Sequence, residues 1–366
     1  MYFYYGIVAF IIIFYFALKL KRNANSDKLF LFVVFVLLIV IAGVRSTHVG
    51  GDLNHYIPNF FDFGRKSFVD ILHNRFKYGY IFSCLCKIEY WINDSPISFL
   101  LCMNALALIP VYYFIKKYSP NYLLSVYIYI TFAFYTNTFN SVRSSISMGI
   151  GLIALKYVME RNFWKFIICF LIATEIHLTF APFILLYLIY PKKVTLPYMV
   201  STIGLSICVS QAFSLWGYIS SAAIAYDEGA YGYDKLAQST GGYSMLALIV
   251  VTTFAFYFIN KKKEDSPLIL LSMHCLIIAS CILAFATALS LFNRIAMFFY
   301  IILVIYIPIT LKSIKTIPLR RCCSIVTYIL FFIYFIAFVM TPLKDWNYTN
   351  KQGTLPYEFY WERNGA

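Results

Sequence analysis

Ionisable side chains stand beside apolar runs at four places in this sequence. Such positions are costly unless the charge is paired or solvated, which makes them candidates for function. The first place contains Arg45, a glycine pair and Asp52, and the glycine pair permits a tight turn that would bring the Asp52 carboxylate back toward the membrane. The second contains Asn140 and Arg143, which share a helical face with several serines. A guanidinium offers a fixed fork of donors that matches phosphate oxygens, so both arginines could bind a phosphorylated substrate.

The other two places hold a histidine and a further arginine. Glu175 and His177 interrupt a long apolar stretch, and a neutral histidine can accept a proton at neutral pH. Asn293 and Arg294 stand at the junction of two apolar runs. Simpler explanations exist: an interhelical hydrogen bond for His177, arginines that snorkel at helix ends, and an ordinary solvated loop around Asp52.

All four places fall toward the same membrane face in the topology predicted below. Cations that only snorkel would be scattered over both faces of the membrane. The sequence therefore predicts a shared pocket for an anionic substrate embedded in the membrane, and a lipid-linked pyrophosphate has this chemistry.

Membrane helices must position these side chains. Of the 366 residues, 61% are hydrophobic and 13% are charged, which excludes a soluble globular domain and a disordered chain. About 20 consecutive apolar residues span a bilayer. We predict an all-α, polytopic integral membrane protein with about 12 transmembrane segments, some short or re-entrant, at 2–18, 28–44, 96–115, 121–136, 141–159, 163–176, 178–190, 195–218, 243–259, 267–290, 292–311 and 322–340.

The stretch 163–190 is long for one helix. We predict two short half-helices that meet near Glu175–His177. The competing interpretation is a single tilted helix, which would invert every later loop and contradict the distribution of basic residues. His274, whose apolar run holds no charged companion, is predicted to be structural.

The net charge of +14 is an orientation signal, because short loops rich in Lys and Arg stay in the cytoplasm. The excess falls on the loops of one side, so nothing in the sequence calls for nucleic acid. This assignment places both termini on the periplasmic side. We predict one transmembrane domain over 1–366, with three outer stretches: a loop at 45–95 whose segment Tyr78–Ile92 is interfacial or re-entrant, a loop at 220–242, and a tail at 341–366.

The nine cysteines are scattered, and no Cys or His spacing typical of a metal site occurs. We expect no structural disulfide, no metal and no cofactor.

The ordered set of polar motifs resembles the EpsG-like branch of the Wzy-type bacterial polysaccharide (O-antigen or capsule) polymerases. The matching pieces run through roughly the first 300 residues: Arg45 with Gly51-Asp52 and Tyr56, Tyr78-Gly79-Tyr80, Asn140 with Arg143, His177, and Asn293-Arg294 with Tyr300. Two positions differ from the family pattern, namely Ser144, where the family has Gln, and Lys77-Tyr78, where it has an acidic residue and a proline.

The resemblance implies a metal-independent glycosyltransferase of the bacterial inner membrane. It would move a growing glycan from undecaprenyl pyrophosphate to the non-reducing end of an undecaprenyl-pyrophosphate-linked repeat unit on the periplasmic face. Its partners would be that lipid-linked oligosaccharide, membrane lipid and a chain-length regulator protein.

Roles follow for the polar residues. The guanidinium groups of Arg45, Arg143 and Arg294 would hold the pyrophosphate as negative charge builds on it. His177 is the first choice for general base and Asp52 the second, and Asp52 could instead orient the acceptor. Residues expected to contact sugar or support the site are Asn140, Glu175, Asn293, Tyr56 and Tyr300.

Two rival functions remain open. A lipid-linked oligosaccharide flippase would show half-length repeats and a polar site at mid-membrane, and neither is apparent in the sequence. A ligase would use the same donor with a different acceptor, which sequence composition does not distinguish.

Overall fold

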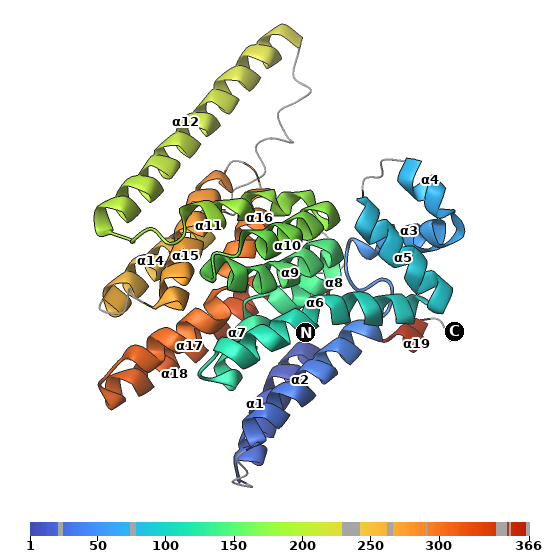
Figure 1. Cartoon of the computed structure of the whole chain (residues 1–366), viewed down its shortest axis with the longest axis horizontal. Helices are drawn as coiled ribbons and strands as arrows, with labels where there is room; N and C mark the ends of the chain where they lie inside the picture. Colours follow the sequence, from blue (N-terminus) through green and yellow to red (C-terminus); the bar gives the residue numbers. More distant parts are fainter. Residues whose placement is uncertain are drawn as a thin grey trace. The chain divides into compact units, whose positions relative to one another are not determined.

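The computed structural model describes residues 1–20, 25–73, 78–228, 242–261, 266–287, 289, 291–341, 350 and 353–363, and in these ranges the regular structure is helical (Figure 1). The described ranges contain no β-strand, and an isolated antiparallel bridge joins Arg45 to Phe359. An all-helical chain is what a bilayer requires of spanning segments, because a helix satisfies its own backbone hydrogen bonds.

Eight helices in the described ranges are long and apolar enough to cross a membrane. A ninth candidate is the bent pair α16 (Leu291–Tyr300) and α17 (Leu303–Ser313), whose axes differ by 45°. The chain is thus a multi-pass membrane protein, as predicted. The eight are α1 (Tyr2–Leu20), α2 (Ser26–Gly43), α6 (Pro96–Tyr118), α9 (Val142–Met159), the Leu196–Ser214 part of α12 (Leu196–Glu228), Tyr243–Asn260 of α14 (Gly242–Asn260), α15 (Pro267–Phe285), and α18 (Ile317–Tyr334) with a π-helix (Phe335–Val339).

Three of the twelve predicted spans form shorter helices, so the count of twelve stays a prediction. The first becomes α7 (Tyr122–Thr131) and α8 (Phe134–Asn140), divided at Ala133, which has a left-handed backbone (φ 68°). The second is α10 (Phe163–Ile176), whose 14 residues extend about 21 Å at 1.5 Å per residue. The third is a 3₁₀ helix (Leu178–Phe183) followed by α11 (Ile184–Ile189).

The predicted break near Glu175–His177 is confirmed. Helix α10 ends at Ile176, and His177 has an extended backbone (φ −150°, ψ 105°) before the 3₁₀ helix begins. A single tilted helix over this stretch is therefore excluded.

The chain divides into two compact units, and each is described by itself. The first unit contains residues 1–157, 162–181 and 307–366. In it α2 packs along α6. Gly43 at the end of α2 lies against Leu101 near the start of α6. Earlier in α2, the Phe35 ring centroid lies 5.7 Å from that of Tyr112, which is later in α6, so the two helices are antiparallel.

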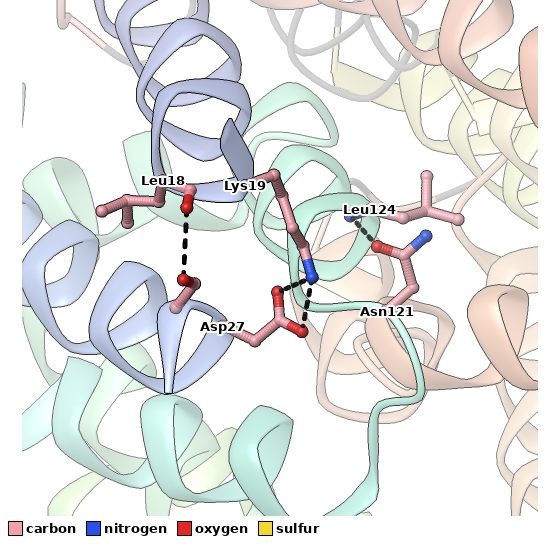
Figure 2. Close-up of polar contacts among 6 residues, drawn as sticks. Leu18, Lys19, Asp27, Asn121 and Leu124 are labelled. Atoms are coloured by element: carbon pink, nitrogen blue, oxygen red, sulfur yellow. Dashed lines mark hydrogen bonds and ion pairs between the residues drawn. The ribbon is translucent and has the colours of Figure 1, made fainter. Parts of the chain in front are cut away.

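One end of this unit carries basic residues. At the turn from α1 to α2, the Lys19 ammonium lies 2.9 Å from the Asp27 carboxylate (Figure 2). The same view shows the Asn121 side chain accepting a hydrogen bond from the Leu124 N–H at 3.1 Å, which caps the start of α7. Because α2 and α6 are antiparallel, Lys116 and Lys117 at the end of α6 fall at this end too.

The opposite end of α2 is about 27 Å away, at 1.5 Å for each of its 18 residues. The end of α8 lies here, because Arg45 donates to the Phe139 carbonyl at 3.2 Å, and α9 begins three residues later. The Ser147 hydroxyl of α9 donates to the Ala173 carbonyl in the last turn of α10 at 2.8 Å, which brings the end of α10 to the same place. The C-terminal segment 353–363 also lies here, since the Ser46 N–H donates to the Glu358 carbonyl at 2.8 Å. The first residues of α1 join it, because the Tyr4 hydroxyl donates to the Thr354 carbonyl at 2.9 Å. Both ends of the chain that the structure describes thus share one end of this unit.

The stretch 45–95, predicted as an outer loop, is mostly helical. It forms α3 (Leu53–Arg65), α4 (Phe68–His73) and α5 (Tyr80–Ile92), which pack together, with α5 also against α6 (Figure 1). At 13 residues, α5 is too short to span a bilayer. The Lys87 of α5 is buried and donates to the Gly64 carbonyl at 3.2 Å, so its charge stabilises this small helical layer.

The second unit contains residues 158–161 and 182–306, and α15 is its buried centre, packed against α12, α14 and α16. His274 of α15 is fully buried and its Nε2 lies 2.8 Å from the Lys192 carbonyl oxygen, which agrees with a structural role. Of the predicted loop 220–242, residues up to Glu228 continue α12, and 229–241 lie outside the described residues.

Candidate functional site

Arg143 lies in the first turn of α9. Helix α8 ends at Asn140, and Ser141 (φ −104°, ψ 66°) interrupts the chain before α9 begins at Val142. The first N–H groups of a helix have no partner inside it and carry partial positive charge. The half-buried guanidinium therefore stands at a helix end that itself favours anions.

An aromatic surface supports this guanidinium. Its central carbon lies 4.6 Å from the centroid of the Tyr78 ring and 5.9 Å from that of Phe82. A cation over a ring face is attracted by the negative charge of the π system. The rings fix one side of the Arg143 fork, so its donors can face a ligand on the other side.

Glu175 holds the Tyr78–Tyr80 segment in place. The Tyr80 N–H, in the first turn of α5, donates to the Glu175 carboxylate at 2.6 Å. Gly79 has a left-handed backbone (φ 77°), and a Cβ there would lie 2.1 Å from the Glu175 carbonyl oxygen. Only glycine allows this close approach, so Glu175 and Gly79 together position the ring beneath Arg143.

Asp52 is positioned by the turn that the glycine pair allows. Gly50 has φ 120°, and a Cβ there would lie 2.2 Å from the Phe139 carbonyl oxygen. The Asp52 N–H donates to the Asn140 side-chain oxygen at 2.9 Å. The start of α3 is thus tied to the end of α8, three residues before Arg143.

Tyr56 lies near both Asp52 and Arg143. It lies one turn into α3 and is buried. Burial raises the pKa of its hydroxyl, the nearby Asp52 carboxylate acts in the same direction, and a hydrogen bond from Arg143 acts against them. The phenol stays protonated at neutral pH, and while its oxygen accepts from Arg143 its proton is available to an acceptor.

His177 lies at the break after α10. Its N–H donates to the Ala173 carbonyl at 3.0 Å, and the Ser147 hydroxyl of α9 bonds the same carbonyl. The half-buried histidine is therefore next to the α9–α10 contact and two residues beyond Glu175. The first unit brings six of the predicted site residues to one end, namely Asp52, Tyr56, Asn140, Arg143, Glu175 and His177; we call these, with Tyr78, the Arg143 cluster.

Arg45 has different surroundings. Its side chain is fully buried, and its guanidinium donates to the carbonyls of Val49 at 3.1 Å, Phe139 at 3.2 Å and Ala42. The guanidinium also stacks on the Phe139 ring at 4.5 Å. Burial lowers the pKa of Arg45 to about 10, which still leaves it charged at neutral pH. These carbonyl bonds favour a structural role for Arg45 over contact with a phosphate.

The C-terminal segment completes the turn beside Arg45. The Gly50 N–H donates to the Gly353 carbonyl at 2.7 Å, and the Ser46 N–H donates to the Glu358 carbonyl at 2.8 Å. Gly353 has φ 64°, and a Cβ there would lie 2.8 Å from the Gly51 nitrogen. Sequence reasoning missed this contact, because main-chain hydrogen bonds leave little signal in side-chain types.

Three predicted site residues belong to the second unit. All lie on α16, where Arg294 is exposed, Asn293 is half-buried and Tyr300 is buried at 3% exposure. The first unit thus carries the geometry described above, and these three residues are placed within their own unit only.

Tyr78 belongs to the cluster but is not one of the site residues predicted from the sequence. It is part of a motif that carries the family resemblance. Its signal was the Tyr-Gly-Tyr sequence that opens α5. In the part of the chain that the structure describes, no group of three or more His, Cys, Asp or Glu could hold a metal ion. The nine cysteines are free thiols.

Comparison with known proteins finds a partial relative. The amylovoran biosynthesis protein AmsC of Erwinia amylovora is 25% identical over 166 residues, which cover 44% of this chain and 44% of that protein. The chain thus spans less than half the length of this curated relative. No solved structure matches. Residues 28–359 match the profile of the EpsG family, a range that contains every residue of the Arg143 cluster as well as Arg294. The resemblance seen in the motifs is thereby confirmed, and the chain belongs to the EpsG family.

Proposed function

We propose that this protein is a polysaccharide polymerase. It transfers a growing glycan from undecaprenyl pyrophosphate to the non-reducing end of an undecaprenyl-pyrophosphate-linked repeat unit. Family membership and the AmsC relative, which is named for amylovoran biosynthesis, support the class of reaction. The observation that carries the proposal is the half-buried Arg143 guanidinium at the start of α9, held on the Tyr78 ring and bonded to Tyr56.

The Arg143 guanidinium and the first N–H groups of α9 bind the pyrophosphate of the donor. The acceptor hydroxyl oxygen attacks the anomeric carbon of the donor glycan through an oxocarbenium-like state. The bond from that carbon to the pyrophosphate oxygen breaks, and undecaprenyl pyrophosphate leaves with the electron pair. Arginine donors aimed at this leaving group stabilise the charge as it develops, without any need for a metal ion.

The acceptor hydroxyl also loses a proton. His177 takes this proton in our proposal, because an imidazole nitrogen can act as a general base and the residue lies two positions after Glu175, at the break that follows α10. Asp52 orients the acceptor through its position next to Tyr56 and Asn140, and it is the second choice for the base.

Arg294, Asn293 and Tyr300 lie on α16 of the second unit, and their roles stay predictions from the sequence. Arg45 has a positioning role in our proposal instead of a phosphate contact, because its side chain is fully buried and three of its N–H donors already bond carbonyls.

The cluster acts on the periplasmic face of the bacterial inner membrane. Within the first unit it lies at the opposite end of α2 from Lys19, Lys116 and Lys117, and basic loops stay in the cytoplasm. Its partners are the lipid-linked oligosaccharide and membrane lipid, with a chain-length regulator protein as a further expected partner.

Arg143→Ala tests the proposal. Removing one such charge from a closed site lowers the rate by about 10²–10³-fold, so cells should keep single lipid-linked units on the outer face and lose long polymer. Exposed Arg65 on α3 offers a matched control, and Arg65→Ala should keep a normal polymer ladder. Full-length polymer from folded Arg143→Ala would refute the proposal.

The accumulated intermediate separates the rival functions. Single units stranded on the inner face would indicate a flippase. A ligase would fail to build polymer from purified lipid-linked units in the absence of another acceptor, whereas the proposed enzyme succeeds with those units alone.

A further inference from the structure

The C-terminal segment presents an aromatic stack that the proposed reaction does not use. Phe359 and Trp361 stack face to face, with ring centroids 4.8 Å apart and planes 11° apart. Behind them, Phe3 at the start of α1 stacks on Tyr357 at 3.9 Å and meets the Phe359 ring edge-on at 5.7 Å. The stack therefore runs from half-buried rings to an exposed one.

The outermost ring is both exposed and fixed. Trp361 is 58% exposed. It lies in the short helix α19 (Tyr360–Arg363), where the Glu362 carboxylate accepts from the Phe359 N–H at 2.7 Å and the Glu362 N–H donates to the Phe359 carbonyl at 3.2 Å. This reciprocal capping holds the turn. A large apolar face kept in a single orientation outside the core is a preformed contact surface.

The segment that carries the Phe359–Trp361 stack is hydrogen-bonded to the chain just before the Asp52 turn. The Tyr360 N–H donates to the Val44 carbonyl at 2.9 Å, and the Ser46 N–H donates to the Glu358 carbonyl at 2.8 Å. The segment that carries Trp361 is thus bonded to the residues before and after Arg45. It lies at the same end of the unit as the Arg143 cluster.

Two ligand classes suit an exposed indole, namely a sugar ring and the membrane interface. The carboxylates of Glu358 and Glu362 stand on either side of the Phe359–Trp361 stack in the sequence. Carboxylates accept hydrogen bonds from hydroxyl groups, which a sugar supplies in number. They are repelled by anionic lipid headgroups. The chemistry favours the sugar.

We propose that Trp361 is a stacking platform for a pyranose ring of the glycan chain, with Glu358 and Glu362 binding hydroxyl groups of the same segment. The inference rests on the proposed function for the identity of the glycan. A platform outside the reacting centre retains the growing chain between transfer steps. Its loss shortens the product while leaving single transfers possible.

Fluorescence of Trp361 tests binding without catalysis. The protein has five tryptophans, and replacing the other four with Phe makes Trp361 the sole reporter. The probe is a delipidated oligosaccharide of several repeat units, released from the producing cells by mild acid and added to protein in lipid nanodiscs. We expect a saturable change in Trp361 emission. A matched protein that keeps only Trp91, which is 63% exposed on α5, should not respond.

Brominated phospholipid in the nanodiscs tests the other ligand class. We expect little quenching of Trp361. Strong quenching of Trp361 by the lipid, with no response to the oligosaccharide, would make Trp361 a membrane anchor and overturn the proposal.

Polymer length in cells tests the consequence. Trp361→Ala should shorten the modal polymer length and weaken oligosaccharide binding by about two- to tenfold, the range expected for one aromatic stacking contact. Trp361→Phe, which keeps a flat ring, should restore most of both. Normal length and binding in folded Trp361→Ala would refute the platform without touching the polymerase assignment, which the Arg143 variants test separately.

Discussion

Arg45 and Arg143 are arginines at the same end of the first unit, and each stacks on an aromatic ring, yet their burial and hydrogen bonding differ. Arg45 is fully buried and bonded to three carbonyls, whereas Arg143 is half-buried on an aromatic face at a helix start. Donors already bonded to the protein are not available to a ligand. The comparison therefore separates an arginine that holds main-chain segments together from one that our proposal places at the substrate.

The contrast extends to the glycines next to each arginine. Gly50 allows the main chain to approach Phe139, whose carbonyl also accepts from Arg45. Gly79 allows it to approach Glu175 and so aims Tyr78 at Arg143. In both places a left-handed glycine brings two distant segments into contact. The contact beside Gly50 is bonded by the buried Arg45, whereas the one beside Gly79 places the Tyr78 ring against Arg143.

The largest expected effect is that of Arg45→Ala. Three carbonyls would lose their donor, and each unsatisfied group costs about 1–3 kcal/mol, so we expect loss of folded protein. Immunoblots of membranes and thermal unfolding in detergent measure this. A stable Arg45→Ala protein that makes no polymer would remove the contrast and return Arg45 to the phosphate site.

Gly79→Ala should come next. The left-handed backbone costs of order 1–3 kcal/mol for a residue with a Cβ, and the added atom would meet the Glu175 carbonyl. We expect reduced thermal stability and little polymer. Gly6→Ala is the matched control, because nothing lies within 4 Å of a Cβ at Gly6. Equal behaviour of the two variants would argue against the close approach.

Arg143→Lys keeps the positive charge but removes the planar guanidinium, so it tests whether the geometry of the donors matters at this position. We expect normal membrane levels and polymerisation lowered by about tenfold or more, which corresponds to about 1.4 kcal/mol of transition-state stabilisation. Initial rates with purified lipid-linked units give the measurement. An unchanged rate would mean that charge alone is sufficient at this position.

Glu175 should show a smaller effect that depends on the replacement. Glu175→Ala removes the acceptor for the Tyr80 N–H and should cost about 1 kcal/mol, as loss of a helix cap does. Glu175→Gln keeps an acceptor oxygen and should stay near the parent in stability and rate. A folded but inactive Glu175→Gln would show that the carboxylate charge takes part in the reaction.

The smallest effect is expected at the basic end. The Lys19–Asp27 ion pair is exposed, and such pairs contribute about 0–1 kcal/mol. Lys19→Ala should leave thermal stability and polymer length almost unchanged. A loss as large as that of Gly79→Ala would mean that this end is coupled to the site.

The sequence predicted features that depend on local composition. The helical membrane fold follows from apolar runs, and the break at His177 follows from a polar interruption in a stretch too long for one helix. The glycine pair predicted a tight turn, and the structure has one, whose Asp52 N–H donates to Asn140 at the end of α8. The membrane side of the cluster remains a prediction from basic loops.

What the sequence could not predict depends on partners far along the chain. Asn140 and Arg143 were placed on one helical face, but Ser141 divides α8 from α9 between them. Arginine is a residue type that binds phosphate, so the sequence alone suggests this role for Arg45. Only the fold shows that its guanidinium donates to carbonyls. The contact between Gly50 and Gly353 consists of backbone groups and leaves no pattern in the side chains.

That last contact has a consequence for biosynthesis. Gly50 leaves the ribosome 303 residues before Gly353, an interval of about 15–60 s at ~5–20 residues per second. During this interval the early membrane helices have been synthesised, but the Gly50 N–H has no Gly353 carbonyl to bond. The nascent chain therefore cannot complete the hydrogen bonding of the turn before Asp52 until translation has passed Gly353, when nearly all of the described helices have been made.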